Sequence, residues 1–282
     1  MKKGLILEGG AMRGLFSAGV IDAFLENEIR FDGVIGVSAG AAFGCNYKSE
    51  QKGRVLRYNT RFCKDKRYCS LRSLIKTGDL YNAEFCYHEV PEHLDILDTQ
   101  TYRNNPTEFT VVCTDVTTGT PVYQKLEKMD YTDLEWMRAS ASMPLVSRIV
   151  RIDTYNLLDG GIADAIPVKY FASIGYDRNV VILTRPADYI KKKTKLLPLF
   201  KAAFRKYPKF VDTIARRHDI YNETLEYIRQ KEKQGDLIAI RPENALPIGK
   251  VEHNADKMRT VHAIGYQTGQ KYAERVKDFL KG

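Results

Sequence analysis

Ser38 lies in a short glycine-flanked segment that could hold a nucleophile. The segment Gly36-Val37-Ser38-Ala39-Gly40 matches the pattern G-x-S-x-G, in which a serine occupies a sharp turn between a strand and a helix. Such a turn closes only if the residues two positions before and after the serine are small, and here both are glycine. The segment favours a nucleophilic serine. The alternative is a plain turn in which Ser38 caps the following helix.

A second glycine-rich turn, Gly9-Gly10-Ala11-Met12-Arg13-Gly14, follows another short apolar run. Backbone N–H groups at such a turn can form an anion site, and the oxyanion of an acyl transfer reaction is one such anion. Arg13 would add positive potential or fix the loop. The alternatives are a nucleotide-binding loop and a plain turn. The spacing matches neither G-x-G-x-x-G nor G-x-x-x-x-G-K-[ST], so a nucleotide loop is the weaker interpretation.

A nucleophilic serine needs a base, and Asp159 is the best-placed candidate. It ends a predicted strand and precedes Gly160-Gly161, which would let the loop approach Ser38 closely. A desolvated aspartate within hydrogen-bond reach can accept a serine proton. Taken alone, an ordinary Asp-Gly turn is the better interpretation of these residues. A histidine base is poorly supported, because none of the five histidines has a context typical of a catalytic loop: His88, His93, His218, His253 and His262.

The elements around these residues predict a parallel sheet. Residues 4–8 and 31–37 are predicted strands, and each is followed by a helix, over 15–28 and from 41 onward. This alternation is typical of α/β folds, and it places both glycine turns at the carboxyl edge of the sheet, where ligands bind. Further strands are predicted at 109–114, 119–123 (antiparallel to the preceding one), 155–158, 179–184 and 237–240, and further helices at 133–141 and 255–280.

Composition predicts a single soluble domain without an integral membrane segment. No run approaches the roughly 20 apolar residues that span a bilayer. Glu8 interrupts the first apolar run too early for a signal peptide, which predicts a cytoplasmic protein. The five cysteines are irregularly spaced with no C-x-x-C pair, so we expect reduced thiols and neither a disulfide framework nor a zinc site. The net charge of +9 favours contact with polyanions such as nucleic acid, acidic substrates or anionic lipid headgroups.

Together, the three glycine-flanked segments resemble the signature blocks of the patatin-like phospholipase family. They occur in the family's order: 9–14, 36–40 and 159–161. The segment Ala139-Ser140-Ala141-Ser142-Met143-Pro144 also resembles the family's A-S-x-S-x-P stretch before the catalytic aspartate, and residues 113–119 resemble a strand and turn of bacterial members. The resemblance extends over residues 4–185.

The resemblance implies a three-layer α/β/α fold with a mainly parallel central sheet. Residues 1–185 would form the catalytic core, and residues 186–282 a mostly helical C-terminal extension packed on the same domain. The substrate would be a lipid or fatty acyl ester, such as an acyl ester of a glycerolipid. The family needs no metal or other cofactor for this reaction.

The resemblance also implies a Ser-Asp dyad without histidine. Ser38 would carry the acyl group, and Asp159 would act as base and then activate water. Backbone N–H groups would form the oxyanion hole, from Gly9, Gly10, Ala11, Arg13 and Ala39. The family often has glycine where Ala11 stands, and alanine adopts a positive φ poorly, which leaves the donors in that loop open.

The stretch from Tyr189 to His218 is strongly basic, with ten lysines and arginines. Apolar residues recur in it at spacings of three and four, and Pro208 is predicted to split it into two helices. A basic amphipathic helix can lie in an anionic lipid interface, which would place the protein peripherally at the inner face of the membrane. The favoured alternative is a helix that packs its apolar stripe against the sheet.

Other functions compete with lipid acyl hydrolysis. An acyltransferase would use the same dyad, and a non-catalytic lipid-binding or regulatory protein could share the fold, although intact Ser38 and Asp159 argue against it. Charge alone suggests nucleic acid, and the sequence has no recognisable reading motif, so no nucleic-acid partner is expected. The sequence does not predict an oligomeric state.

Overall fold

The computed structural model describes all 282 residues and contains one eight-stranded sheet. The strand order is β5-β6-β3-β2-β1-β7-β8, with β4 paired to β3 outside this path. The five strands from β3 to β8 along this order are parallel, whereas β4, β5 and β6 pair antiparallel. The strands are β1 (Lys2–Leu7), β2 (Gly33–Val37), β3 (Glu108–Asp115), β4 (Pro121–Lys125), β5 (Val150–Ile152), β6 (Tyr155–Asp159), β7 (Tyr176–Ile182) and β8 (Leu237–Ile240).

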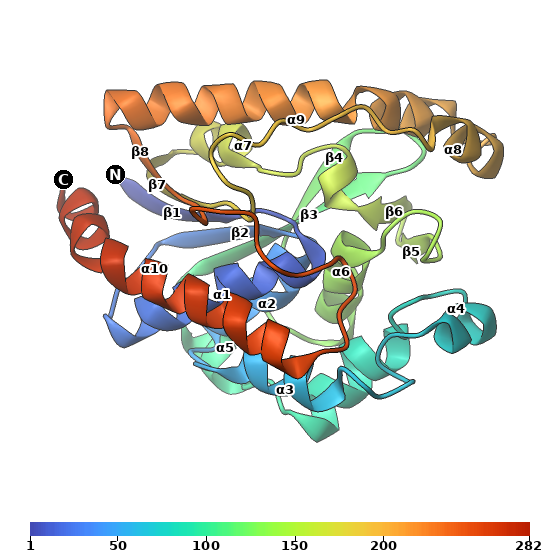
Figure 1. Ribbon diagram of the computed structural model, residues 1–282, viewed down its shortest axis with the longest axis horizontal. Coiled ribbons are helices and arrows are strands. Elements are labelled where there is room, and N and C mark those ends of the chain that lie inside the picture. Colours follow the sequence, from blue (N-terminus) through green and yellow to red (C-terminus); the bar gives the residue numbers. More distant parts are fainter.

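Helices cover both faces of the sheet, which makes the three layers predicted from the sequence (Figure 1). On one face lie α1, α2 and α10, and on the other lie α7 and α9. The helices are α1 (Gly14–Glu26), α2 (Ala39–Lys48), α3 (Arg54–Phe62), α4 (Leu71–Thr77), α5 (Thr99–Asn104), α6 (Tyr131–Ala141), α7 (Val168–Ser173), α8 (Leu197–Ala203), α9 (Pro208–Gln234) and α10 (Ala255–Lys281), with short 3-10 turns η1 (Ala11–Arg13) and η3 (Gly160–Ile162) and a π-helical segment η2 (Phe85–Leu94).

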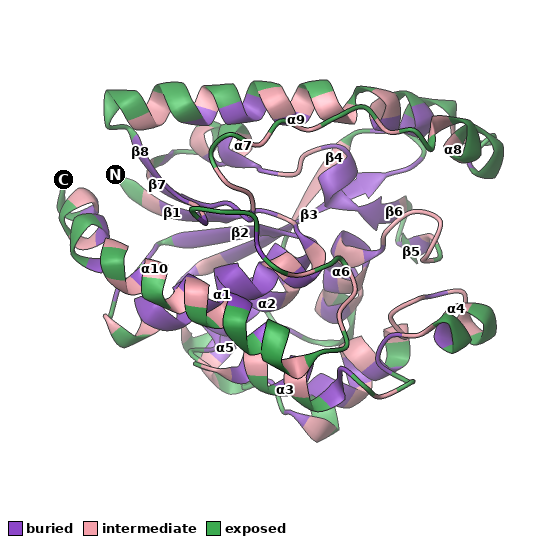
Figure 2. Cartoon of the chain, viewed as in Figure 1, coloured by how far each residue is buried: buried purple, intermediate pink, exposed green.

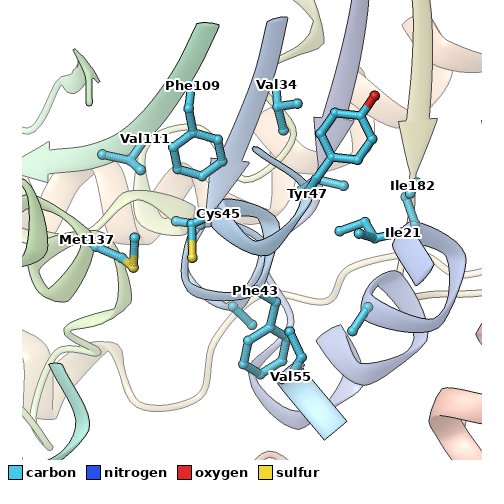
Figure 3. Packing of buried hydrophobic residues seen from close by; sticks show 14 of the residues in the cluster. Ile21, Val34, Phe43, Cys45, Tyr47, Val55, Phe109, Val111, Met137 and Ile182 are labelled. Carbon is cyan, nitrogen blue, oxygen red and sulfur yellow. The ribbon is translucent and has the colours of Figure 1, made fainter. Parts of the chain in front are cut away.

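The central strands are buried on both faces, because helices pack above and below them. All five residues of β2 are buried, as are the last four of β1. Such strands need a continuous apolar run instead of an alternating one, which is the pattern of residues 4–7 and 33–37. Phe43, Cys45 and Tyr47 of α2 belong to the same core cluster as Val34 and Phe109 of the sheet, and Figure 3 shows Phe43 near Val55, on the side away from the strands. This packing fixes α2 directly behind the strand that leads to Ser38.

The C-terminal part of the chain is joined to the same sheet. β8 pairs with β7 in parallel, and α10 packs along α1. Pro208 separates α8 from α9, as predicted, and α9 buries Phe210, Val211 and Ile214, so packing is the correct interpretation of its apolar stripe. None of the seven residues of α8 is buried. No helix of the chain is both long enough and apolar enough to cross a bilayer.

Candidate active site

Ser38 occupies a sharp turn between β2 and α2. Its backbone has φ 57° and ψ −120°, a conformation that costs free energy for a residue with a side chain. A Cβ atom on Gly36 would lie 2.3 Å from the carbonyl oxygen of Gly40, and one on Gly40 would lie 2.5 Å from the carbonyl oxygen of Leu7. Only glycine therefore fits at both positions. The two glycines let the turn close and hold the Ser38 hydroxyl at the N-terminus of α2.

The hydroxyl of Ser38 donates a hydrogen bond to Asp159, whose carboxylate comes from the end of β6. The distance from Ser38 Oγ to Asp159 Oδ2 is 2.7 Å, and the other carboxylate oxygen accepts the backbone N–H of Gly161 at 2.7 Å. Both side chains are buried, with 8% and 6% exposed. Burial raises the pKa of Asp159, and the hydrogen bond from Ser38 and the nearby charge of Arg217 oppose this rise. A carboxylate of raised basicity in contact with a serine is suited to accept its proton.

The C-terminal end of α6 supports both members of this pair. Ser140 Oγ accepts the backbone N–H of Ser38 at 3.0 Å and donates to the carbonyl of Val112 at 2.6 Å. The backbone N–H of Asp159 donates to the carbonyl of Ser142 at 2.8 Å. In the sequence, residues 139–144 were notable only for their resemblance to a family segment. In the structure, its serines fix the two backbones that carry the hydroxyl and the carboxylate.

The glycine-rich loop lies against Ser38. Some of its N–H groups donate hydrogen bonds within the chain, and others have no acceptor there. The N–H of Arg13 donates to the carbonyl of Gly10 at 3.1 Å, and that of Gly9 donates to Ala165 at 3.5 Å, so neither is open for an oxyanion. The N–H of Gly10 has no acceptor within the chain. Ala11 does adopt a positive φ, 49°, despite its side chain.

Three of the five predicted oxyanion donors therefore remain. These are Gly10 and Ala11 in the loop, and Ala39 in the first turn of α2, where N–H groups lack an acceptor within the helix. The helix dipole of α2 adds positive potential at the same place. For Gly9 and Arg13 the prediction is corrected, because their N–H groups close the loop itself.

Two cavities meet at Ser38, and their linings differ. The first is apolar, since 17 of its 20 lining residues are hydrophobic, and it extends from Met12 toward Tyr58, Tyr87 and Met137. The second has a volume of about 550 Å³ and reaches both Ser38 and Asp159. Six cationic side chains line it: Arg13, Arg185, Lys191, Lys192, Arg217 and Lys250. Ser38 thus stands between an apolar and a cationic compartment.

No histidine lines either cavity. His88 lies 3.1 Å from Glu135, His262 lies 2.8 Å from Asp22, and His253 contacts the carbonyl of Cys63. The remaining two, His93 and His218, lie beside exposed carboxylates. A Ser-His-Asp triad therefore has no geometric basis in this chain.

Comparison with known families agrees with this arrangement. A family model described as patatin-like phospholipase matches residues 5–172, which is more than half of the chain. The chain belongs to the patatin-like phospholipase family. The matched residues of this patatin-like domain include Ser38, Asp159 and the glycine-rich loop. A second family model, described only as a domain of unknown function, matches residues 207–281.

Two of the proteins similar to this patatin-like protein have names that state no activity. The uncharacterized protein YjjU of Escherichia coli (strain K12) is 31% identical over 193 residues, which is 65% of this chain and 52% of the relative. The uncharacterized NTE family protein Rv1063c of Mycobacterium tuberculosis is 26% identical over 178 residues, 63% of this chain and 48% of the relative. The chain thus spans about half the length of these curated relatives. Among solved structures, VipD from Legionella pneumophila matches with a TM-score of 0.42 and 11% identity, covering 97% of this chain and 67% of that one.

Only Arg13 among the six cations at the site of this patatin-like protein was predicted from the sequence. The other five follow no motif, and three of them, Lys191, Lys192 and Arg217, lie in the basic stretch at 189–218, for which packing against the sheet was the favoured interpretation. Arg217 lies on α9, and its Nε donates to the carbonyl of Gly161 at 2.5 Å. The only sequence signal was the density of lysine and arginine, which does not show which side chains turn inward.

Arg217 is expected to control the acid limb of the pH profile. Its charge lowers the pKa of Asp159, so Arg217→Gln should raise that pKa further. Because the base must be deprotonated, activity is lost as pH falls through this pKa, and the acid limb of kcat/KM should move to higher pH. The measurement is kcat/KM for a neutral p-nitrophenyl ester from pH 4 to 9. Arg216→Gln, at the adjacent exposed position, is the matched control, and an acid limb that stays at the wild-type pH in Arg217→Gln would contradict this role.

Proposed function

We propose that this patatin-like protein hydrolyses fatty acyl esters of glycerolipids through a Ser38-Asp159 dyad. The observation that carries the proposal is the 2.7 Å hydrogen bond between the two side chains at the point where an apolar and a polar cavity meet. The acyl chain would enter the first compartment from Ser38, and the alcohol portion of the ester would lie in the second. The ester carbonyl would then lie over Ser38.

The reaction follows from the positions of these groups. Ser38 Oγ attacks the ester carbonyl carbon while its proton passes to Asp159, and the negative charge on the carbonyl oxygen is bound by the open N–H groups of Gly10, Ala11 and Ala39. The tetrahedral intermediate then expels the alcohol, which takes the proton from Asp159, and leaves an acyl ester on Ser38. Asp159 next removes a proton from water, which attacks that ester. The fatty acid leaves, and the proton returns to Ser38.

The apolar cavity supports an acyl chain as the group transferred to Ser38. Its single charged lining residue, Arg54, is buried and lies 3.2 Å from the carboxylate of Asp95. The charge is thus neutralised within the wall, so the cavity presents an apolar interior. Burying methylene groups there gains about 0.8 kcal/mol each. The cavity volume of about 100 Å³ would take the first few methylene groups of the chain.

The test is hydrolysis of p-nitrophenyl esters of increasing chain length by the purified protein, with products measured in water and in the presence of a monoacylglycerol. Release of free fatty acid, with kcat/KM rising with chain length, would support the hydrolase. Acyl transfer to the monoacylglycerol in preference to water would replace it with an acyltransferase. Absence of turnover on every ester would leave the non-catalytic lipid-binding alternative.

We also propose that the segment from Ile190 to α8 makes a peripheral contact with an anionic membrane surface. Ile190, Leu196 and Leu199 are exposed by 67%, 54% and 51%, beside lysines 192, 193, 195 and 201. Figure 2 shows α8 as mostly exposed, at the end of α9. The segment borders the cationic cavity through Leu196 and Phe200, so the contact would face the site toward lipid. Exposed apolar and basic side chains together suit an anionic lipid interface.

The double substitution Ile190→Ser/Leu199→Ser is expected to weaken vesicle binding about tenfold, because two exposed apolar side chains no longer enter the interface. Sedimentation with vesicles of phosphatidylglycerol and phosphatidylethanolamine measures it. Ile96→Ser/Ile174→Ser, which removes two exposed isoleucines outside both cavities, is the control. The proposed membrane contact would be contradicted if both double variants bound vesicles equally well. It would also be contradicted if high salt left vesicle binding of the wild-type protein unchanged.

A further inference from the structure

Six cationic side chains converge on the wider cavity beside Ser38 from distant parts of the chain. Arg13 comes from the glycine-rich loop, Arg185, Lys191 and Lys192 from the segment after β7, Arg217 from α9 and Lys250 from the segment before α10. None of the six forms a salt bridge with a carboxylate. The cluster therefore concentrates positive charge at the site without a matching anion.

These charges are held in place by aromatic rings and by a backbone carbonyl. The guanidinium of Arg185 lies 4.6 Å from the ring centroid of Tyr189, and Lys191 Nζ lies 4.1 Å from that of Tyr221. The buried Nε of Arg13 has no hydrogen-bond partner. Such contacts orient a cation but leave its N–H donors open. The donors are therefore available to a ligand in the cavity.

The two carboxylates of this cavity are already engaged. Glu8 accepts hydrogen bonds from the Thr184 hydroxyl at 3.0 Å and from the Tyr221 hydroxyl at 2.6 Å. Asp159 is held by Ser38 and Gly161. Neither makes a direct ion pair with a member of the cluster. An anion with several acceptor oxygens is the group that these surroundings lack.

Burial and mutual repulsion act on the cluster in the same direction. Burial, and then the charges of neighbouring arginines, lower the pKa of Lys191 to about 7 and lower the pKa of Lys250. The pKa of Arg13 is lowered by burial and by Arg185. Uncompensated cations in a partly buried site are unfavourable, and an anionic ligand would remove that cost. The contrast is Arg54 in the apolar cavity, which has Asp95 as its own partner.

We propose that the cluster of Arg13, Arg185, Lys191, Lys192, Arg217 and Lys250 binds a phosphate group on the alcohol portion of the substrate. The inference rests on the proposed function, since it assigns the two cavities to the two halves of one ester. Arginine forks and lysine ammonium groups are the usual partners of phosphate oxygens. The substrate class is then an acyl glycerophosphate, with its acyl chain in the apolar cavity and its phosphate among these cations. The leaving alcohol departs from the cationic side of Ser38.

The kinetic test compares two soluble esters with the same decanoyl chain, 1-decanoylglycerol 3-phosphate and 1-decanoylglycerol. The wild-type ratio of kcat/KM, phosphate ester over neutral ester, is expected to exceed one. In Arg185→Gln/Lys250→Gln this ratio should fall about 10- to 100-fold, the range for losing one or two charge-assisted hydrogen bonds. Lys271→Gln/Arg275→Gln on α10 makes the same change in net charge away from both cavities and should keep the wild-type ratio.

Calorimetric titration of the wild-type protein separates this site from the enzymatic activity. Glycerol 3-phosphate is expected to bind, inorganic phosphate to bind more weakly and glycerol not at all, with binding lost in Arg185→Gln/Lys250→Gln. Equal affinity for inorganic phosphate would reassign the cluster to free phosphate and overturn the headgroup role. Glycerol 3-phosphate binding without turnover of either ester would contradict the proposed function and leave the phosphate site standing. If the neutral ester is hydrolysed and the ratio of kcat/KM, phosphate ester over neutral ester, is the same in every variant, the phosphate site is overturned but the proposed function is not.

Discussion

Ser38→Ala is expected to lower ester hydrolysis by at least about 10³-fold, because the variant lacks the hydroxyl proposed to carry the acyl chain. The loss should appear in kcat, with the fold unchanged, since the alanine removes one hydroxyl and its bond to Asp159. The measurement is initial rate on p-nitrophenyl decanoate, together with covalent labelling by a fluorophosphonate, which should also disappear. Removal of the hydroxyl should leave the unfolding midpoint in urea close to that of wild type.

Ser17→Ala is the matched control for this change. Ser17 is also a buried serine, on α1, and its hydroxyl has no hydrogen-bond partner. Its loss should leave both rate and labelling at the wild-type level. Residual hydrolysis and labelling in Ser38→Ala comparable to Ser17→Ala would place the nucleophile elsewhere and refute the dyad.

Asp159→Asn is expected to lower kcat/KM by about 10³- to 10⁴-fold, the scale seen when the carboxylate of a serine hydrolase is replaced by an amide. The amide keeps the shape of the side chain but cannot take the proton of Ser38. Stability should respond differently from activity. Because burial raises the pKa of Asp159 above its usual value, the ionised carboxylate destabilises the folded state above that pKa, and the variant should be at least as stable as wild type at pH 7.

Asp164→Asn is the matched control for the aspartate. Asp164 is a buried carboxylate whose pKa is also raised by burial, and it accepts the Tyr123 hydroxyl at 2.8 Å, but it lines neither cavity. Urea denaturation and kcat/KM measured side by side distinguish the two variants. If Asp159→Asn keeps most of its activity while a variant such as His88→Ala loses it, a histidine is the base and the dyad is wrong.

The secondary structure near the site followed closely from local sequence. Every predicted strand is present, with its bounds shifted by at most three residues, because buried parallel strands require the continuous apolar runs seen at 4–8, 31–37 and 179–184. The short strand β5 and the π-helical segment η2 were not predicted. Residues 85–94 include Pro91 and lack a clear period, so local pattern could not assign them.

The Ser38-Asp159 pair could be predicted from the sequence because its steric requirements are local. Gly36 and Gly40 are needed within five residues of Ser38, and Gly161 supplies an N–H to Asp159 two residues away. For the glycine-rich loop, the sequence could predict the candidate N–H donors only in part. An N–H group of this loop can bind a ligand only if it does not already donate a hydrogen bond within the turn, as the N–H of Arg13 does. Such backbone hydrogen bonds cannot be predicted from the types of the residues.

By itself, the sequence determined the family, the sheet-forming segments and the two residues proposed to act on the ester, because each depends on short-range sterics and hydrophobic pattern. The tertiary structure alone decided what surrounds them. Arg13, Arg185, Arg217 and Lys250 meet only because β7 ends, α9 begins and the segment before α10 passes at the same edge of the sheet, where Lys191 and Lys192 also line the cavity. The sequence does not show whether a lysine or arginine side chain faces solvent or a cavity, because its orientation depends on the packing of elements that are distant in the chain.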